Sequence, residues 1–241
     1  FSPTYLKTIH NQLSAILNHA VNMYGLKDNV ARKAGTMGKE ENKEMEFWTQ
    51  EGFQAFLECV ADKPISYYAF EILYWTGIRE GELLALTPGD FNFEKKTLRI
   101  NKSYQRLEGK DVITDPKTPK SNRTIVMPDF LAVEMEDFIS SLYGIRDDDR
   151  IFTISKSYLH HEMDRGAKLA GVKKIRIHGL RHSHISLLIN LGFSALAIGE
   201  RVGHEAVDIT YHYAHLFPTV QTDMAAQLET EREALVNVRK E

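Results

Sequence analysis

The sequence predicts a mainly helical protein with one small antiparallel three-stranded β-sheet. Two observations predict this class. Apolar residues recur at helical spacing along most of the 241-residue chain. Residues 90–127 change instead to short β-type runs separated by turn-forming residues. Hydrophobic residues make up 43% of the chain, a share typical of globular proteins that bury a core.

The chain is expected to begin with a helix over residues 4–24, where apolar residues are spaced three and four apart. Residues 28–46 are polar and contain Gly35 and Gly38, which favours a linker. A single helix before a linker cannot bury its apolar face alone. We therefore expect residues 1–27 to belong to a second domain that is either mostly missing from this chain or docked on the rest of it.

The main domain is expected over residues 47–241. Thr49 can cap its first helix, and a strongly apolar second helix ends at Thr76-Gly77. The strands are expected near residues 91–100, 112–113 and 124–126. Residues 114–122 contain two prolines and predict an exposed hairpin tip. The predicted helices of this domain cover residues 50–62, 65–75, 79–86, 129–142, 155–170, 178–190, 194–201, 207–213 and 218–236.

Composition limits the possible classes of function. The net charge of −3 gives no nucleic-acid signal for the whole chain. Basic residues nevertheless concentrate in residues 89–125 and 164–186, and acidic residues in 129–150, which favours a basic face opposite an acidic one. Cys59 is the single cysteine, so no intramolecular disulfide forms. No apolar run is long enough to span a membrane and no signal peptide is evident, so we expect a cytoplasmic protein without a membrane partner.

Several polar residues match what is needed to break a phosphodiester. The planar arginine fork fits phosphate oxygens, a tyrosine hydroxyl can attack phosphorus, and a proton donor assists the leaving oxygen. His178 and Arg181 are three residues apart and share one face of a predicted helix. Arg79 follows a helix end, with Glu82 three residues further on to pair with it. Tyr213 lies nine residues after His204.

These residues belong to five ordered motifs: TGIREGE (76–82), PKTPKSNR (116–123), HGLRH (178–182), VGH (202–204) and YAHL (213–216). Together they resemble the tyrosine recombinase (phage integrase) family over about residues 47–241. The form of the motifs is most similar to integrases of phages and conjugative transposons from Gram-positive bacteria. The resemblance implies the catalytic-domain architecture of that family, and residues 1–27 resemble the end of its core-binding domain.

The resemblance implies a role for each matching residue. Arg79 and Arg181 would clamp the scissile phosphate, and His204 would help to hold it in the transition state. His178 would be the general base and Lys117 the general acid. Tyr213 would be the nucleophile that forms a 3′-phosphotyrosine. Glu82 would support Arg79.

Some alternatives stay open at this point. Tyr211 is the rival nucleophile and Lys120 the rival acid, and Val202 replaces the usual leucine before Gly-His. His182, His184, His212 and His215 could suggest zinc, but no HExxH pattern and no nearby cysteine support it. We expect no metal and no cofactor, and interpret His182 as a structural hydrogen-bonding residue.

The resemblance implies integration or excision of a mobile element by cleavage and rejoining of double-stranded DNA, without metal or ATP. It further implies a homotetramer on DNA and an excisionase partner. The helix expected over residues 218–236 could dock on its own chain or on a neighbouring subunit. A non-catalytic DNA-binding relative and a type IB topoisomerase-like enzyme are the alternative functions.

Overall fold

The computed structural model describes residues 1–38, 45–115, 121–203, 213, 228–230 and 232. It divides the chain into two compact units, residues 1–45 and 46–241. Among the described residues, no helix is both long enough and apolar enough to cross a membrane.

The first unit consists of helix α1 (Pro3–Tyr24) and the short helix α2 (Val30–Lys33). Ser2 caps α1 through its side chain, and Gly25 ends it in the left-handed conformation. The Asn29 side chain donates to the Ser14 carbonyl oxygen (2.9 Å) and to the Asn18 side chain (2.8 Å). Residues 28–38, expected as part of a linker, therefore contain a helical turn that folds back on α1.

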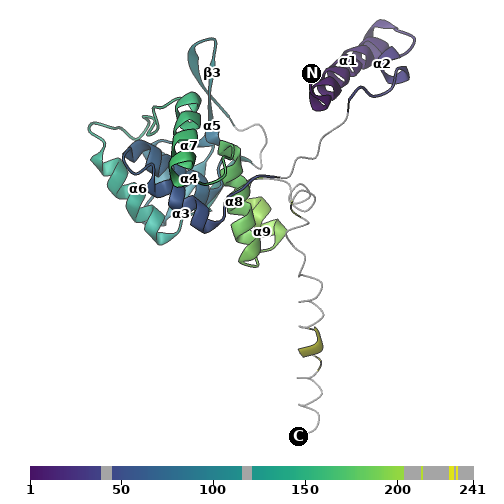
Figure 1. Ribbon diagram of the computed structural model, residues 1–241. Coiled ribbons are helices and arrows are strands. Elements are labelled where there is room, and N and C mark those ends of the chain that lie inside the picture. Colours follow the sequence, from purple (N-terminus) through teal and green to yellow (C-terminus); the bar gives the residue numbers. More distant parts are fainter. Residues whose placement is uncertain (39–44, 116–120, 204–212, 214–227, 231, 233–241) are drawn as a thin grey trace. The chain divides into compact units, whose positions relative to one another are not determined.

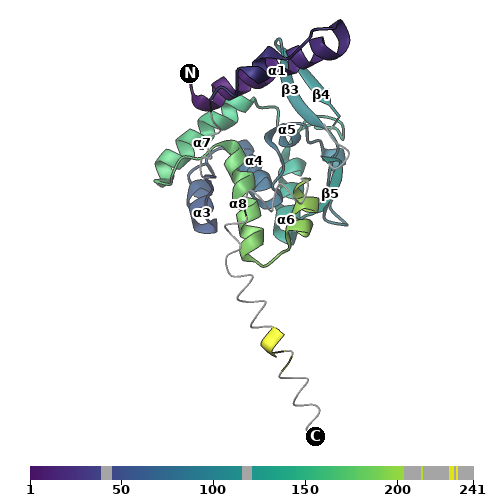
Figure 2. The same ribbon diagram turned by 90° about the vertical axis from the view of Figure 1, so that its right-hand side faces the viewer.

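The second unit is built around helix α4 (Pro64–Thr76), which is buried on nearly every side. Its continuous apolar composition explains this position, because a helix that is hydrophobic all round must be enclosed. Helices α3 (Gln50–Glu58), α6 (Asp129–Ser141) and α8 (Ile177–Asn190) pack against it, and α7 (Lys156–Ala170) packs against α3 and α8. In the view of Figure 2, α3 and α7 lie on one side of α8 and strand β5 (Arg123–Val126) on the other.

The predicted helices of this unit that fall within the described residues up to 203 are confirmed to within a few residues. Thr49 caps α3 as expected, because its hydroxyl accepts the Gly52 N–H (3.3 Å). Helix α5 (Glu80–Leu83) lies inside the helix expected over residues 79–86, and α9 (Ala195–Val202) is shifted by one residue from the helix expected over 194–201. A 3₁₀ turn, η1 (Pro88–Asp90), leads into the first strand. The segments 207–213 and 218–236 lie largely outside the described residues. Within them only Tyr213, residues 228–230 and residue 232 are described, and these are helical.

The β-structure differs from the prediction in its pairing. Strands β1 (Phe91–Asn92), β2 (Thr97–Ile100) and β5 form a three-stranded antiparallel sheet in the order β1-β2-β5. The predicted strand at residues 112–113 belongs instead to β4 (Lys110–Thr114), which pairs with β3 (Ser103–Leu107) in a separate two-stranded sheet. β3 packs against α5, and the far end of the hairpin projects beyond the helices of the second unit (Figure 1).

The expected hairpin tip at residues 114–122 is therefore wrong. The hairpin turns at Glu108 and Gly109, both with positive φ (49° and 78°), which suits the tight turns of two-residue hairpins. Residues 115–122 connect β4 of one sheet to β5 of the other, since β5 pairs with β2 and not with β4.

Candidate functional site

The first part of the site is the turn between α4 and α5. Gly77 ends α4 in the left-handed conformation (φ 65°). Arg79 is the N-cap of α5, and its backbone N–H donates to Glu82 Oε2 (2.8 Å) while its Nη1 donates to Glu82 Oε1 (2.9 Å). The expected pair between Arg79 and Glu82 is thus present. The Arg79 side chain is 36% exposed and the Glu82 side chain 6%, so solvent reaches the arginine and not its support.

Arg181 lies in the first turns of α8, one helical turn from His178. It is 1% exposed, although it carries a charge. Nη1 of Arg181 donates to the carbonyl oxygen of Gly77 (2.6 Å) and Nη2 to that of Val202 (2.6 Å), while its buried Nε has no partner among the described residues. Burial lowers the pKa of the Arg181 guanidinium, and the charges of Arg79 and Arg123 lower it further.

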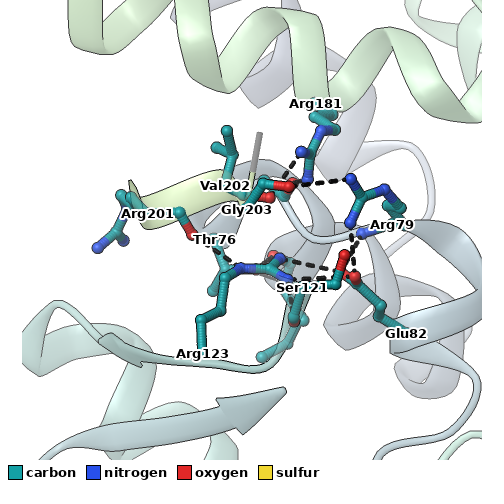
Figure 3. A network of polar contacts seen from close by, with 11 residues as sticks. Thr76, Arg79, Glu82, Ser121, Arg123, Arg181, Arg201, Val202 and Gly203 are labelled. Carbon is teal, nitrogen blue, oxygen red and sulfur yellow. Dashed lines mark hydrogen bonds and ion pairs between the residues drawn. The ribbon is translucent and has the colours of Figure 1, made fainter. Parts of the chain in front are cut away.

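The C-terminal end of α9 brings the arginines together. Three successive carbonyl oxygens there each accept a hydrogen bond from a different arginine: Arg201 from Nε of Arg123 (2.9 Å), Val202 from Arg181, and Gly203 from Nη2 of Arg79 (3.1 Å). Figure 3 shows the three guanidinium groups converging on this helix end. The last carbonyls of a helix have no partner within it and carry partial negative charge, which explains why cations collect there.

Arg79 and Arg181, which lie about a hundred residues apart in the sequence, are therefore neighbours in the fold. Their donors point at oxygen atoms of one short segment. A phosphate that entered between them would meet the same donors, in the bidentate geometry that arginine offers to oxyanions.

Tyr213 lies against α8 and is 2% exposed. Its hydroxyl is hydrogen-bonded to Nδ1 of His182. Burial raises the pKa of Tyr213, and the charge of Arg181 opposes this in part, so the hydroxyl is neutral and needs a base before it can attack.

His178 and His182 stack edge to face on α8, with ring centroids 4.8 Å apart. Desolvation lowers the pKa of His178, and the charges of Arg181 and Arg79 lower it further, which keeps the imidazole neutral and able to accept a proton near pH 7. The histidine bonded to Tyr213 in this structure is nevertheless His182. Sequence reasoning had assigned His182 a structural hydrogen bond only.

Of the predicted site residues, Arg79, Glu82, His178, Arg181 and Tyr213 are described. Lys117, His204 and the rival residues Lys120 and Tyr211 lie outside the described residues. Asp115 and Ser121, which flank the segment containing Lys117, line a cavity of about 450 Å³ together with Arg79 and Glu82.

Arg123 was missed as a residue of this site. Its Nη1 and Nη2 donate to both carboxylate oxygens of Glu82 (3.1 and 2.9 Å). It is the last residue of the PKTPKSNR motif, and nothing in its local sequence separates it from an ordinary arginine at the start of a strand.

The site can be compared with known proteins. Residues 46–219 match the profile of the phage integrase family. The ICEBs1 integrase of Bacillus subtilis (strain 168) is 32% identical over 93% of this chain and 65% of that protein. The integrase of Staphylococcus phage L54a is 30% identical over 67% of this chain and 51% of that protein. The chain thus spans less than two thirds of the length of these relatives.

Solved structures show the same fold. The Tn1549 transposon integrase in complex with a circular intermediate DNA has a TM-score of 0.78 at 20% identity, covering 94% of this chain and 80% of that one. A lambda integrase dimer bound to a core site has a TM-score of 0.58 at 17% identity, covering 83% of this chain and 71% of that one. The predicted fold class, mainly helical with a small antiparallel three-stranded sheet, is confirmed, and the structure adds a second, two-stranded sheet. The match over residues 46–219, most of this chain, shows that it belongs to the phage integrase family.

Proposed function

We propose that this chain is the DNA-cleaving part of a site-specific recombinase that integrates or excises a mobile element in the cytoplasm. The observation that carries this proposal is the convergence of Arg79 and Arg181, with Tyr213 bonded to His182, the residue that follows Arg181 on α8. Residues 47–241 would form the catalytic domain, and residues 1–27 the end of a core-binding domain joined to it by residues 28–46.

The substrate would be double-stranded DNA. The Tn1549 and lambda integrases of the comparison are both bound to DNA. Affinity should come mainly from phosphate contacts made by basic side chains and should fall steeply with salt. A homotetramer on two DNA sites and an excisionase partner complete the proposal, with the segment 218–236 docking either in cis or on a neighbouring subunit.

In the proposed reaction the Tyr213 oxygen attacks the scissile phosphorus. A phosphotyrosine bond forms and the bond from phosphorus to the 5′ oxygen breaks. His178 takes the tyrosine proton and Lys117 gives a proton to the leaving 5′ oxygen. Arg79, Arg181 and His204 hold the charge that develops on the non-bridging oxygens. A 5′ hydroxyl from a second strand then reverses these steps, so the bond energy is conserved and no nucleotide hydrolysis is needed.

The test is covalent capture on a DNA substrate nicked beside the cleavage site. The protein should form a protein–DNA adduct in EDTA, and Tyr213→Phe should abolish it while Tyr211→Phe keeps it. An adduct that survives Tyr213→Phe and disappears with Tyr211→Phe would refute the nucleophile assignment. DNA binding without any adduct would favour a non-catalytic relative, and relaxation of supercoiled plasmid without strand exchange would favour a topoisomerase-like enzyme.

The same assay tests which histidine is the base. His178→Asn should slow adduct formation at saturating DNA and remove the acid limb of its pH dependence, because a neutral imidazole must accept the proton. The bond between His182 and Tyr213 offers the alternative. Loss of the acid limb in His182→Asn, with the limb retained in His178→Asn, would transfer the role to His182.

A further inference from the structure

The contacts of Arg123 support a further inference, which rests on the proposed function and concerns a residue that has no role in it so far. Its side chain is 6% exposed, and all three of its nitrogen atoms donate hydrogen bonds. Nη1 also donates to the carbonyl oxygen of Ser121 (3.0 Å). The fork of Arg123 is filled by the two oxygens of one carboxylate, so it is not open to a phosphate.

The partner of Arg123 is the carboxylate that also holds Arg79. Glu82 accepts four N–H groups: the backbone and Nη1 of Arg79, and Nη1 and Nη2 of Arg123. Burial by itself would raise the pKa of Glu82, but the bonds and charges of Arg123 and Arg79 lower it overall, so Glu82 is ionised. One carboxylate fixed from both sides can hold Arg79 in one position.

The charge of Arg123 also affects how strongly the site attracts an anion. Glu82 and Arg79 alone would form a neutral pair, and a neutral pair attracts a phosphate weakly. With Arg123 the three side chains carry a net charge of +1. The buried arginine satisfies the carboxylate and leaves the partly exposed Arg79 with its attraction for an anion.

Arg123 also reaches the end of α9 through its Nε bond to the carbonyl oxygen of Arg201. Two residues further along the chain, the Gly203 carbonyl oxygen contacts Arg79, and His204 follows. Arg123 itself begins β5, directly after the segment that contains Lys117. The Arg123 side chain therefore connects its own segment, which follows the one containing Lys117, to Glu82 on α5 and to the end of α9 (Figure 3).

We propose that Arg123 is a positioning residue for DNA cleavage, acting through Glu82 on Arg79 and through the Arg201 carbonyl on the end of α9. Lysine at this position keeps the charge and loses the bidentate fork and the Nε bond. A displacement of about 1 Å at the reacting groups can cost about a hundredfold in rate. Arg123→Lys should therefore slow adduct formation at saturating DNA by about ten- to a hundredfold.

A matched control exists elsewhere in the same unit. Arg165 donates to Glu162 through Nε (3.0 Å) and Nη2 (2.8 Å), and Lys63 donates to the same carboxylate (2.6 Å). Glu162 is 5% exposed, like Glu82. Arg165→Lys thus breaks the same kind of buried shared carboxylate, with no contact to Arg79, Arg181 or Tyr213.

The experiment measures three quantities for wild type, Arg123→Lys, Arg123→Gln and Arg165→Lys: the melting temperature, the Kd for DNA and the single-turnover rate of adduct formation at saturating DNA. All four proteins are assayed at one temperature, well below the lowest of their melting temperatures, so that neither unfolding nor a temperature difference enters the comparison of rates. Arg123→Lys, which keeps the charge, should lose rate while the Kd changes little. Arg123→Gln should lose rate and also bind DNA more weakly, because it removes the charge. Arg165→Lys should keep the wild-type rate.

A double variant that combines Arg123→Lys with Glu82→Gln tests whether Arg123 acts through Glu82. If Arg123 acts through Glu82, adding Arg123→Lys to Glu82→Gln should cost much less than it costs the wild type, because contacting residues are not additive. The inference would be overturned if both Arg123 variants kept the wild-type rate, or if Arg165→Lys lost as much rate as they do. It would also be overturned if the variants changed only the Kd, or if the effects of Arg123→Lys and Glu82→Gln on the rate were fully additive. An absent adduct in the wild type would instead refute the proposed function itself.

Discussion

Replacing Glu71 by glutamine should stabilise this protein above neutral pH. Glu71 lies on the buried face of α4 and is 5% exposed, and its Oε2 has no hydrogen-bond partner among the described residues. Burial raises the pKa of Glu71 from 4.5 to about 7, and the nearby carboxylate of Glu134 on α6 contributes, while a hydrogen bond with Trp75 opposes the rise.

The direction follows from proton binding. Between pH 4.5 and about 7 the folded protein binds more protons at Glu71 than the unfolded chain does, so the free energy of unfolding falls as pH rises. A pKa difference of about 2.5, at about 1.4 kcal/mol for each pH unit, sets an upper limit of about 3.5 kcal/mol for the stability lost by pH 8. Glutamine keeps the shape without the charge. Because a buried amide has a cost of its own, we expect a gain of about 1–3 kcal/mol at pH 8 and little gain at pH 4.

Urea unfolding at pH 4, 5, 6, 7 and 8, followed by tryptophan fluorescence, measures this change. Glu136→Gln, on an exposed position of α6, is the matched control and should leave the stability curve within about 0.5 kcal/mol of wild type. Curves for wild type and Glu71→Gln that run parallel over this pH range, or a Glu71→Gln protein less stable than wild type at pH 8, would refute the reasoning.

Two other predictions concern the turn that carries Arg79. Gly77→Ala should destabilise the protein by about 2 kcal/mol or more, because φ is +65° and the new Cβ would lie 2.6 Å from Cδ2 of the buried His184. Gly171→Ala, with φ +68° and open space around it, should cost only about 1 kcal/mol. Equal losses in thermal unfolding would show that the contact with His184 is unimportant. Stability should also fall as pH drops from 6.5 towards 3, because burial and the charge of Arg201 lower the pKa of His184 to about 3. Acid titrations of unfolding should show a weaker fall in His184→Gln, and an unchanged slope in that variant would contradict the assignment.

Much of the local structure could be predicted from sequence. Helix caps such as Thr49 and the left-handed Gly77 mark element ends through short-range hydrogen bonds and backbone sterics. The pair of Arg79 with Glu82 was equally accessible, because three residues at a helix start place the two side chains together.

Strand pairing was less accessible. The apolar residues around 112–113 gave a strand but not its partner, because alternation fixes which face a residue occupies and not which strand lies beside it. The β3 strand is half exposed and carries a weak pattern, so the hairpin that it forms with β4 was missed.

By itself, the sequence determined the family and most of the helices, and it predicted the residue types of a phosphodiester-cleaving site, since motifs and caps are local features. Only the tertiary structure decided that Arg79, Arg123 and Arg181 meet at the end of α9, that Glu82 is shared by two arginines, and that His182 holds Tyr213. These contacts join residues separated by 21 to 124 positions. Their geometry depends on how α4, α8, α9 and β5 pack, and no pattern within one segment contains that information.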